Sequence, residues 1–185
     1  MIAKGLDFPK VTLVGILAAD MSLNLPDYKA IEKTFALLTQ VAGRAGRRKV
    51  VGEVVIQTYN PDHYAIVHAQ NHDYQAFYDE EISIRSLSGY SPIKKLAQII
   101  ITDKDVKKVL KTGQKIVMRL KDVLPGNMVI LGPVLPKVAR INNIYRAQII
   151  IKHNGDMDIH PVLTKIYKGF IDEVNIAIYY HPTLL

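Results

Sequence analysis

Leu96-Ala-Gln-Ile-Ile-Ile-Thr102 and Arg146-Ala-Gln-Ile-Ile-Ile-Lys152 share the pentapeptide Ala-Gln-Ile-Ile-Ile. Each copy is followed by a helical pattern and then by a second apolar run, at 127–133 and at 175–180. A strand, a helix and a strand used twice give the order β-α-β-β-α-β. We give this order more weight than the shared pentapeptide, because short identities arise by chance in sequences rich in strands.

The two helical patterns each present one apolar face. In the first helix this face consists of Val106, Val109, Leu110, Gly113, Ile116, Val117 and Leu120. In the second helix, which has Pro161 in its first turn, the face consists of Leu163, Ile166, Tyr167, Phe170, Ile171 and Val174. Such faces are typical of helices that cover a sheet. The sequence therefore predicts an α+β ferredoxin-like domain whose first and third strands are central and buried.

The positive charge is concentrated in the same half. Residues 1–93 contain 9 Lys/Arg and 10 Asp/Glu, a net charge of −1, whereas residues 94–185 contain 15 and 7, a net charge of +8. At spacings of four, three, four and four, its first helix carries a basic stripe formed by Lys104, Lys108, Lys111, Lys115 and Arg119. We predict that this stripe contacts nucleic-acid phosphates, and a merely solubilising helix face is the open alternative.

The first half alternates strands and helices. The apolar run 11–19 predicts a strand buried on both faces of a parallel sheet. A helix over 27–45, a strand over 52–59 and a helix over 73–89 follow, and Asp79-Glu80-Glu81 is expected to face water. This alternation predicts an α/β layer structure. Because Ser88-Gly89-Tyr90-Ser91-Pro92 breaks the last helix, we place the domain boundary between residues 93 and 94.

The composition argues against several classes of site. The chain has no cysteine, so it has neither a disulfide nor a thiolate metal site. Its six histidines show no ligand spacing, and the nearest set, His63, His68 and His72, is predicted to be at the surface or at helix caps. We therefore predict no metal. Apolar runs fall far short of the roughly 20 residues that a membrane helix needs.

A short motif carries the strongest functional signal. In Gln40-Val-Ala-Gly-Arg-Ala-Gly-Arg47, two arginines three residues apart each follow a glycine. Two guanidinium groups at this spacing can bind one phosphate-sized target. Taken alone, the motif is equally compatible with a phosphate-binding loop and with a helix end that carries surface arginines.

Other segments decide between these alternatives. Together with 40–47, the segments Met1-Ile-Ala-Lys-Gly-Leu-Asp-Phe-Pro9 and 11–20 resemble motifs V and VI of superfamily 2 helicases, and more narrowly the primosomal replication-restart helicase family. The resemblance continues through 52–64, 73–78, Arg85, 89–92 and 130–134, and it is densest before residue 93. It implies that residues 1–93 are the C-terminal part of a RecA-like second helicase lobe with a connecting helix.

The resemblance also implies roles for particular residues. By position, the ATP-sensing and catalytic residues are Gln40, Arg44 and Arg47, with Arg47 as the arginine finger. The residues implied to lie at ATP, in a site shared with another lobe, are Gly5, Asp7 and Gly43. Lys4 is implied to contact DNA. Members of the family often have His where this chain has Leu6.

For the whole protein, the resemblance implies an ATP-dependent 3′-to-5′ DNA helicase that recognises stalled or branched forks and restarts replication by primosome assembly. The implied partners are branched and single-stranded DNA, the acidic tail of single-stranded DNA-binding protein and other primosome proteins, without a membrane. The implied location is the bacterial cytoplasm, in association with the nucleoid. The alternative is that residues 94–185 form an autonomous basic module that binds branched DNA or the acidic tail.

Several parts of such a helicase are missing from the sequence. It contains no phosphate loop, no acidic box after a strand and none of the family's zinc-binding cysteines. We therefore expect ATP and Mg²⁺ to act only in the full-length protein, and zinc to bind only upstream. The chain alone is predicted to be inactive. A self-contained enzyme is disfavoured, because no base, nucleophile or metal cluster is apparent.

Overall fold

The computed structural model describes residues 11–43 and 52–182. The described residues form two compact units, one up to Ile84 and one from Arg85 onward. The division falls within a helix, upstream of the predicted boundary at 93/94. None of the helices in the described ranges combines the length and the apolar composition that crossing a bilayer requires.

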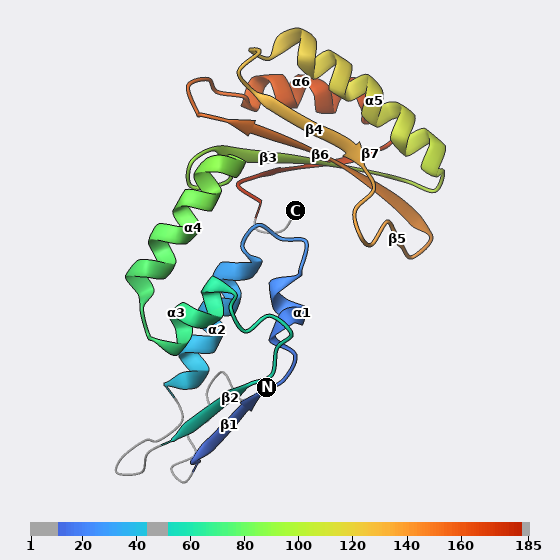
Figure 1. Ribbon diagram of the computed structural model, residues 1–185. Helices are drawn as coiled ribbons and strands as arrows, with labels where there is room; N and C mark the ends of the chain where they lie inside the picture. The colour runs from blue at the N-terminus through green and yellow to red at the C-terminus, as the bar shows by residue number, and fades with distance from the viewer. Residues whose placement is uncertain (1–10, 44–51, 183–185) are drawn as a thin grey trace. The chain divides into compact units, whose positions relative to one another are not determined.

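The second unit contains an antiparallel sheet with two helices on one of its faces (Figure 1). Its elements are β3 (Lys95–Asp103), α5 (Val106–Val123), β4 (Val129–Val134), β5 (Arg140–Ile141), β6 (Ile144–His153), α6 (His160–Phe170) and β7 (Asn175–Tyr180). The strand order is β4-β6-β3-β7, and the short β5 pairs with β6. The expected β-α-β-β-α-β order and the central position of its first and third strands are therefore observed, with β5 as an addition.

The repeated pentapeptide pairs with itself across the two central strands. Ile99 lies opposite Ile149, Ala97 opposite Ile151, and Ile101 opposite Ala147. The two copies are thus related by an approximate two-fold axis at the Ile99–Ile149 pair. Because side chains alternate along a strand, one set of residues from both copies enters the core beneath the helices: Ala97, Ile99, Ile101, Ala147, Ile149 and Ile151.

Helix α5 lies close to the sheet edge at β4. Its buried residues are Val109, Thr112, Gly113, Ile116, Val117 and Leu120, which largely match the predicted apolar face. A Cβ atom at Gly113 would lie 2.7 Å from Cβ of Pro133. Glycine therefore lets the helix approach β4 at this point.

A buried lysine holds the end of α4 (Tyr74–Ser88). Lys152 Nζ donates a hydrogen bond to the backbone oxygen of Ser88 at 2.8 Å and lies 3.5 Å from the ring centroid of Tyr90. Burial, followed by the charge of Lys94, lowers the pKa of Lys152. The cation occupies the position where a helix C-terminus favours positive charge.

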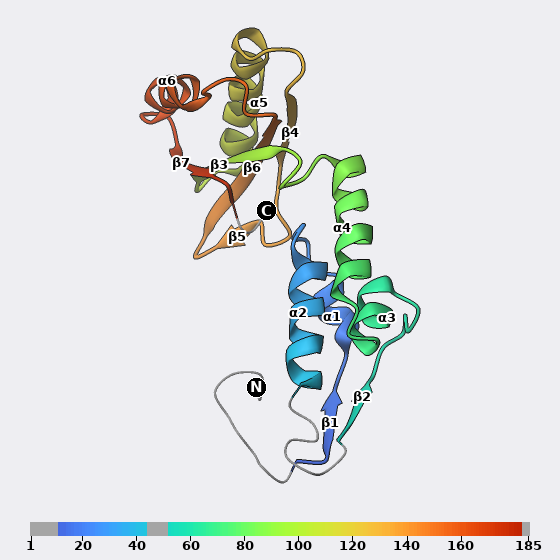
Figure 2. The ribbon, with the colours of Figure 1, turned by 90° about the vertical axis from the view of Figure 1, so that its left-hand side faces the viewer.

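The first unit contains a parallel strand pair and short helices. Its elements are β1 (Leu13–Ile16), α1 (Ala19–Leu23), α2 (Ala30–Ala42), β2 (Glu53–Ile56), α3 (Tyr64–Gln70) and most of α4. Figure 2 shows β1 beside β2, and the two strands pair over four residues each. The stacked rings of Phe35 and Phe77, with centroids 3.9 Å apart, join α2 to α4 within the core of this unit.

Two expectations for this unit are wrong. The run 11–19 is not a strand buried on both faces: alternate residues of β1 are exposed, and Leu13 is 59% exposed. Among the described residues, helices cover the face of the strand pair on which Ile16 and Ile56 pack. The acidic triplet was expected to face water, but its third residue, Glu81, is buried. Glu81 accepts a hydrogen bond from the hydroxyl of Tyr64.

Candidate functional site

The motif residues that the structure describes lie at the end of α2. Gln40 is exposed in its last turn, and Gly43 follows as the C-cap, donating its N–H to the oxygen of Thr39 at 3.1 Å. The other predicted motif residues, Lys4, Gly5, Asp7, Arg44 and Arg47, lie outside the described residues. Their roles remain predictions.

A carboxylate joins the carboxyl ends of the two parallel strands. Asp20 accepts hydrogen bonds from the hydroxyl of Thr58 at 2.8 Å and from the backbone N–H of Tyr59 at 3.0 Å. These bonds, the one from Tyr59 first, lower the pKa of Asp20. The carboxylate therefore holds the strand ends together.

Two histidines of the first unit, His63 and His68, have structural partners. His63 is the N-cap of α3, and its Nδ1 accepts a hydrogen bond from the N–H of Ala65 at 3.2 Å. Nε2 of His68 lies 3.0 Å from a carboxylate oxygen of Glu80. The expectation of a helix-cap histidine is thus confirmed for His63. Within the described ranges, no group of three or more potential metal-binding side chains is placed to hold an ion.

The predicted basic stripe lies mainly on the exposed face of α5. Lys108, Lys111, Lys115 and Arg119 belong to the helix, whereas Lys104 lies in the bend before it. Lys108 forms an ion pair with Asp103 at 3.0 Å, and Lys115 with Glu173 at 3.1 Å.

These ion pairs leave the lysines available to other anions. Both are partly exposed, and exposed pairs contribute only about 0–1 kcal/mol. The pKa of Asp103 is lowered by the N–H of Asp105 first and by Lys108 second, so this carboxylate has backbone support as well. No described residue forms an ion pair with Lys104 or Lys111. The sequence pattern could not reveal which lysines have acidic neighbours, because Glu173 is distant in the chain.

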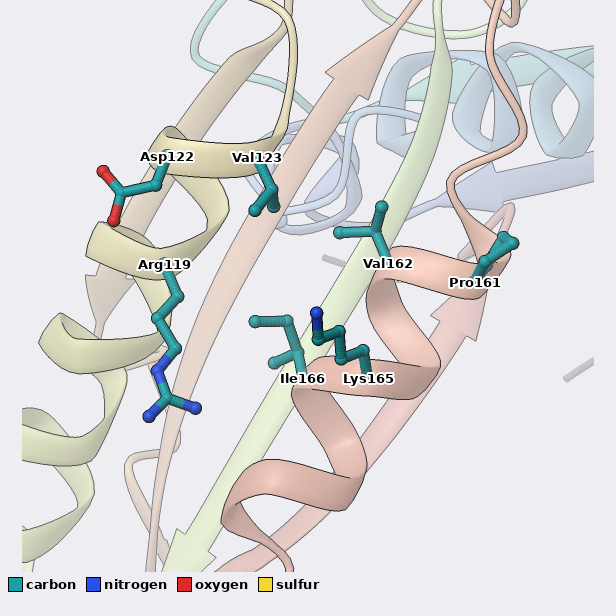
Figure 3. Close-up of a pocket in the computed structure, with 7 residues that line it drawn as sticks. All are labelled: Arg119, Asp122, Val123, Pro161, Val162, Lys165 and Ile166. Carbon is teal, nitrogen blue, oxygen red and sulfur yellow. The ribbon is translucent and has the colours of Figure 1, made fainter.

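A groove of about 450 Å³ lies between α5 and α6 in the second unit. Its lining residues are Arg119, Asp122, Val123, Pro161, Val162, Lys165 and Ile166 (Figure 3). Val162 and Ile166 point from α6 toward α5, Val123 points into the same space, and the carboxylate of Asp122 points away from it. The groove therefore has apolar walls and two basic groups.

Arg119 is held beside the groove by its own packing. Its guanidinium carbon lies 4.6 Å from the ring centroid of Phe170, a cation–π contact. A Cβ atom at Gly169 would lie 3.0 Å from Nη1 of Arg119. The arginine that the sequence placed in the DNA-binding stripe thus also belongs to the groove.

Sequence reasoning missed the α6 side of the groove. The sequence pattern predicts a helix start at Pro161 and a core position for Ile166, and it does not single out Lys165. A signal was present, because Pro161 and Lys165 are four apart and therefore share a helix face. What the pattern could not show is that this edge of α6 lies across from Arg119 and Val123.

This chain resembles known proteins both in its C-terminal part and over most of its length. A family model described as the primosomal protein N C-terminal domain matches residues 86–173. Replication restart protein PriA of Bacillus subtilis is 45% identical over 181 residues, which are 96% of this chain and 22% of that protein. The protein of the same name from Synechocystis is 40% identical over 90% of this chain and 20% of its own length, and that from Borreliella burgdorferi is 35% identical over 100% and 28%.

The chain therefore spans between 20% and 28% of the length of these relatives. The groove and the basic face of α5 lie within the segment that the family model matches.

Proposed function

The chain belongs to the replication restart protein PriA family, and we propose that it forms the C-terminal portion of an ATP-dependent 3′-to-5′ DNA helicase that restarts replication at stalled or branched forks. In the structure, the feature that carries the proposal is the basic groove between α5 and α6. The name of the relatives supports a role of this chain in replication restart. The motif at 40–47 supports a role in ATP hydrolysis.

The first unit contributes to a nucleotide site in this proposal. Its parallel pair of β1 and β2, with Gln40 at the end of α2, is the part of a RecA-like lobe that carries the motif. Arg44 and Arg47 act on the phosphates of ATP bound with Mg²⁺ to another lobe, where an arginine finger stabilises the charge that develops during phosphoryl transfer. Gly5, Asp7 and Gly43 border the same nucleotide, and Lys4 contacts DNA.

The nucleotide role is tested in the full-length protein. We expect Arg47→Ala to reduce DNA-stimulated ATP hydrolysis by about 10³ to 10⁵, with DNA binding largely retained. Arg48→Ala is the matched control, because Arg48 follows the motif directly but lies outside its pattern. If Arg47→Ala and Arg48→Ala hydrolyse ATP equally fast, Arg47 is not the finger.

The second unit binds the partners. Its basic α5 face contacts the phosphates of branched or single-stranded DNA, and its groove receives the acidic tail of single-stranded DNA-binding protein. A tail with acidic residues, an apolar pair and a free carboxylate requires basic groups beside an apolar slot. Arg119 and Lys165 beside Val162 and Ile166 meet both requirements.

The autonomous-module alternative is favoured by one observation. The second unit has its own hydrophobic core, formed by both helices and the central strands. In that case residues 85–185 alone bind forked DNA, with a steep salt dependence. Measuring the fork affinity of residues 85–185 and of the whole chain tests this alternative, since equal affinities favour the module and much weaker binding by residues 85–185 argues against it.

A further inference from the structure

A second cavity, of about 410 Å³, lies in the C-terminal unit at the end of the sheet. Its walls come from the start of β3, the loop after β6, the start of α6 and the residues at the end of β7. Nearly every polar side chain that lines it is basic or aromatic: Lys95, His153, His160, Tyr180 and His181, with Asp158 as the exception. None of these residues belongs to the groove between α5 and α6.

Of the polar side chains that line this cavity, His153 is the buried one. The side chain is buried, with a residue exposure of 7%, and among the described residues its Nδ1 is the buried side-chain atom that has no hydrogen-bond partner. An orphaned N–H costs more than an acceptor left with a bare lone pair. We therefore assign the proton of the neutral ring to Nε2, which leaves an N–H group to be satisfied by a ligand.

Lys95 lies next to this histidine. The two residues are cross-strand partners in the pairing of β3 with β6. A Cβ atom at Gly155 would lie 2.8 Å from Nζ of Lys95, so the glycine provides the room that the ammonium group occupies. His181 is held at the same sheet end, because its N–H donates to the oxygen of Leu96 at 2.9 Å.

The charges around His153 are mostly positive. Burial lowers the pKa of His153, Lys95 and His181 lower it further, and Asp156 opposes them. Asp158 also lines the cavity, but one of its oxygens accepts a hydrogen bond from the N–H of His160 at 3.0 Å. A bound anion would offset this excess of positive charge around the cavity.

Tyr180 and His160 form an aromatic wall. Their rings are nearly parallel, with centroids 5.4 Å apart. Burial first, and Asp158 second, raise the pKa of the Tyr180 hydroxyl, which therefore keeps its proton and remains a donor. An ammonium, an imidazole N–H and a phenol thus border one cavity.

From this arrangement we propose that the cavity binds a phosphate group. Phosphate oxygens accept hydrogen bonds from each of these donors, and such charge-assisted bonds are short and strong. The cavity lies in the range of about 300–1,000 Å³ that is typical of ligand sites, so it leaves room for the sugar or base that carries the phosphate. The phosphate belongs either to a free nucleotide or to the end of a DNA strand. The proposal does not depend on the helicase assignment.

Nuclear magnetic resonance of the histidine side-chain nitrogens in the 185-residue chain tests the proposal. Before phosphate is added, we expect the His153 ring to carry its proton on Nε2. Titration with sodium phosphate at constant ionic strength is expected to shift the Nε2 signal of His153 saturably while the ring stays neutral. The reason is that Nε2–H donates to a phosphate oxygen, whereas a second proton would leave the buried Nδ1 with an unpartnered N–H. A ring protonated at Nδ1, or a shift that sodium chloride reproduces, overturns the proposal.

Two variants locate the bound phosphate. Lys95→Met is expected to weaken phosphate binding about tenfold or more, because it removes one charge-assisted hydrogen bond. Lys168→Met, on the exposed part of α6 outside the cavity, is the control and should bind as the unaltered chain does. Equal binding by the two variants overturns the proposal.

Competition identifies the source of the phosphate. Displacement by a 5′-phosphorylated oligonucleotide, but not by its 5′-hydroxyl form, supports a site for a DNA end. Displacement by adenosine monophosphate but by neither oligonucleotide supports a site for a free nucleotide. If neither the phosphorylated oligonucleotide nor the nucleotide displaces phosphate, the cavity holds an adventitious ion only, and the proposal fails.

Discussion

Nε2 of Gln98 donates a hydrogen bond to Oε1 of Gln148 at 3.1 Å, which links the two copies of the repeated pentapeptide through their only polar residues. The two glutamines lie on the sheet face opposite the helices, and Gln98 is buried. A buried amide needs a partner, so the polar residue in one copy explains the polar residue in the other.

This amide pair makes the first prediction. Gln148→Met leaves the buried amide of Gln98 without its partner, which should lower the free energy of unfolding by about 1–3 kcal/mol. Gln98→Met/Gln148→Met should cost less than the sum of the two single changes, because no unpaired amide remains. Urea unfolding of the four proteins measures this coupling, and strictly additive single effects would contradict it.

The second prediction concerns the approach of α5 to β4. Gly113→Ala places a methyl group 2.7 Å from Cβ of Pro133, so the helix or the strand must shift. We expect a loss of about 1–3 kcal/mol in the free energy of unfolding, the usual cost of overpacking. Gly126→Ala is the control, since nothing lies within 4 Å of its added atom. Equal urea midpoints for the two variants would show that α5 does not pack as described.

The third prediction is a pH dependence at the start of α3. Burial lowers the pKa of His63 from 6.5, although Glu80, Glu81 and Asp20 oppose this shift. Between the lowered pKa and 6.5, the unfolded chain binds more protons than the folded one, so stability rises with pH through this window and is lost on acidification. Protonation also removes the lone pair at Nδ1 that caps Ala65.

Amide hydrogen exchange in α3 measures this effect. We expect the protection of the α3 amides against hydrogen exchange to fall as the pH decreases below 6.5. Since an asparagine cap does not titrate, His63→Asn should keep the cap and lose the pH dependence. His63→Ala should cost about 0.5–2 kcal/mol above pH 6.5 and less on acidification, because the unaltered chain then loses its cap as well. If His63→Asn remains as pH-sensitive as the unaltered chain, another group is responsible.

The fourth prediction concerns DNA binding by the basic face of α5. Each phosphate contact with duplex DNA contributes about 0.9 to the slope of log affinity against log salt concentration. Lys111→Ala should therefore reduce the steepness of this slope by about 0.9 for a forked duplex, with Lys137→Ala in a loop outside the stripe as control. Unchanged slopes in both variants would favour the solubilising role of the stripe.

The sequence predicted most of the second unit and little of its binding surfaces. The pentapeptide repeat and the apolar helix faces were sufficient for the strand order, because both features follow directly from strand and helix periodicity. The groove and the cavity at the sheet end were not foreseen. Lys95 and His153 are 58 positions apart in the chain and become neighbours only through the pairing register. Periodicity carries no information on such distant pairs.

For the first unit, the sequence predicted the pairing of the strands but not the burial of individual residues. The parallel pairing of β1 and β2 was foreseen, but the burial of 11–19 was not, because an apolar run does not reveal how many faces of a strand are covered. Likewise, Glu81 belongs to a charged triplet, yet it is buried beside Tyr64. Whether one acidic residue of a helix turns inward depends on a partner from another helix.

The most direct test of the central claim is binding of an acidic peptide to the groove between α5 and α6. A fluorescent peptide with acidic residues, a terminal apolar pair and a free carboxylate is titrated with the chain, and anisotropy reports the affinity. We predict that Lys165→Ala weakens binding about tenfold, as expected for one charge-assisted bond, whereas Lys168→Ala on the same helix leaves it unchanged. Equal affinities of the Lys165→Ala and Lys168→Ala proteins for the peptide would contradict the account.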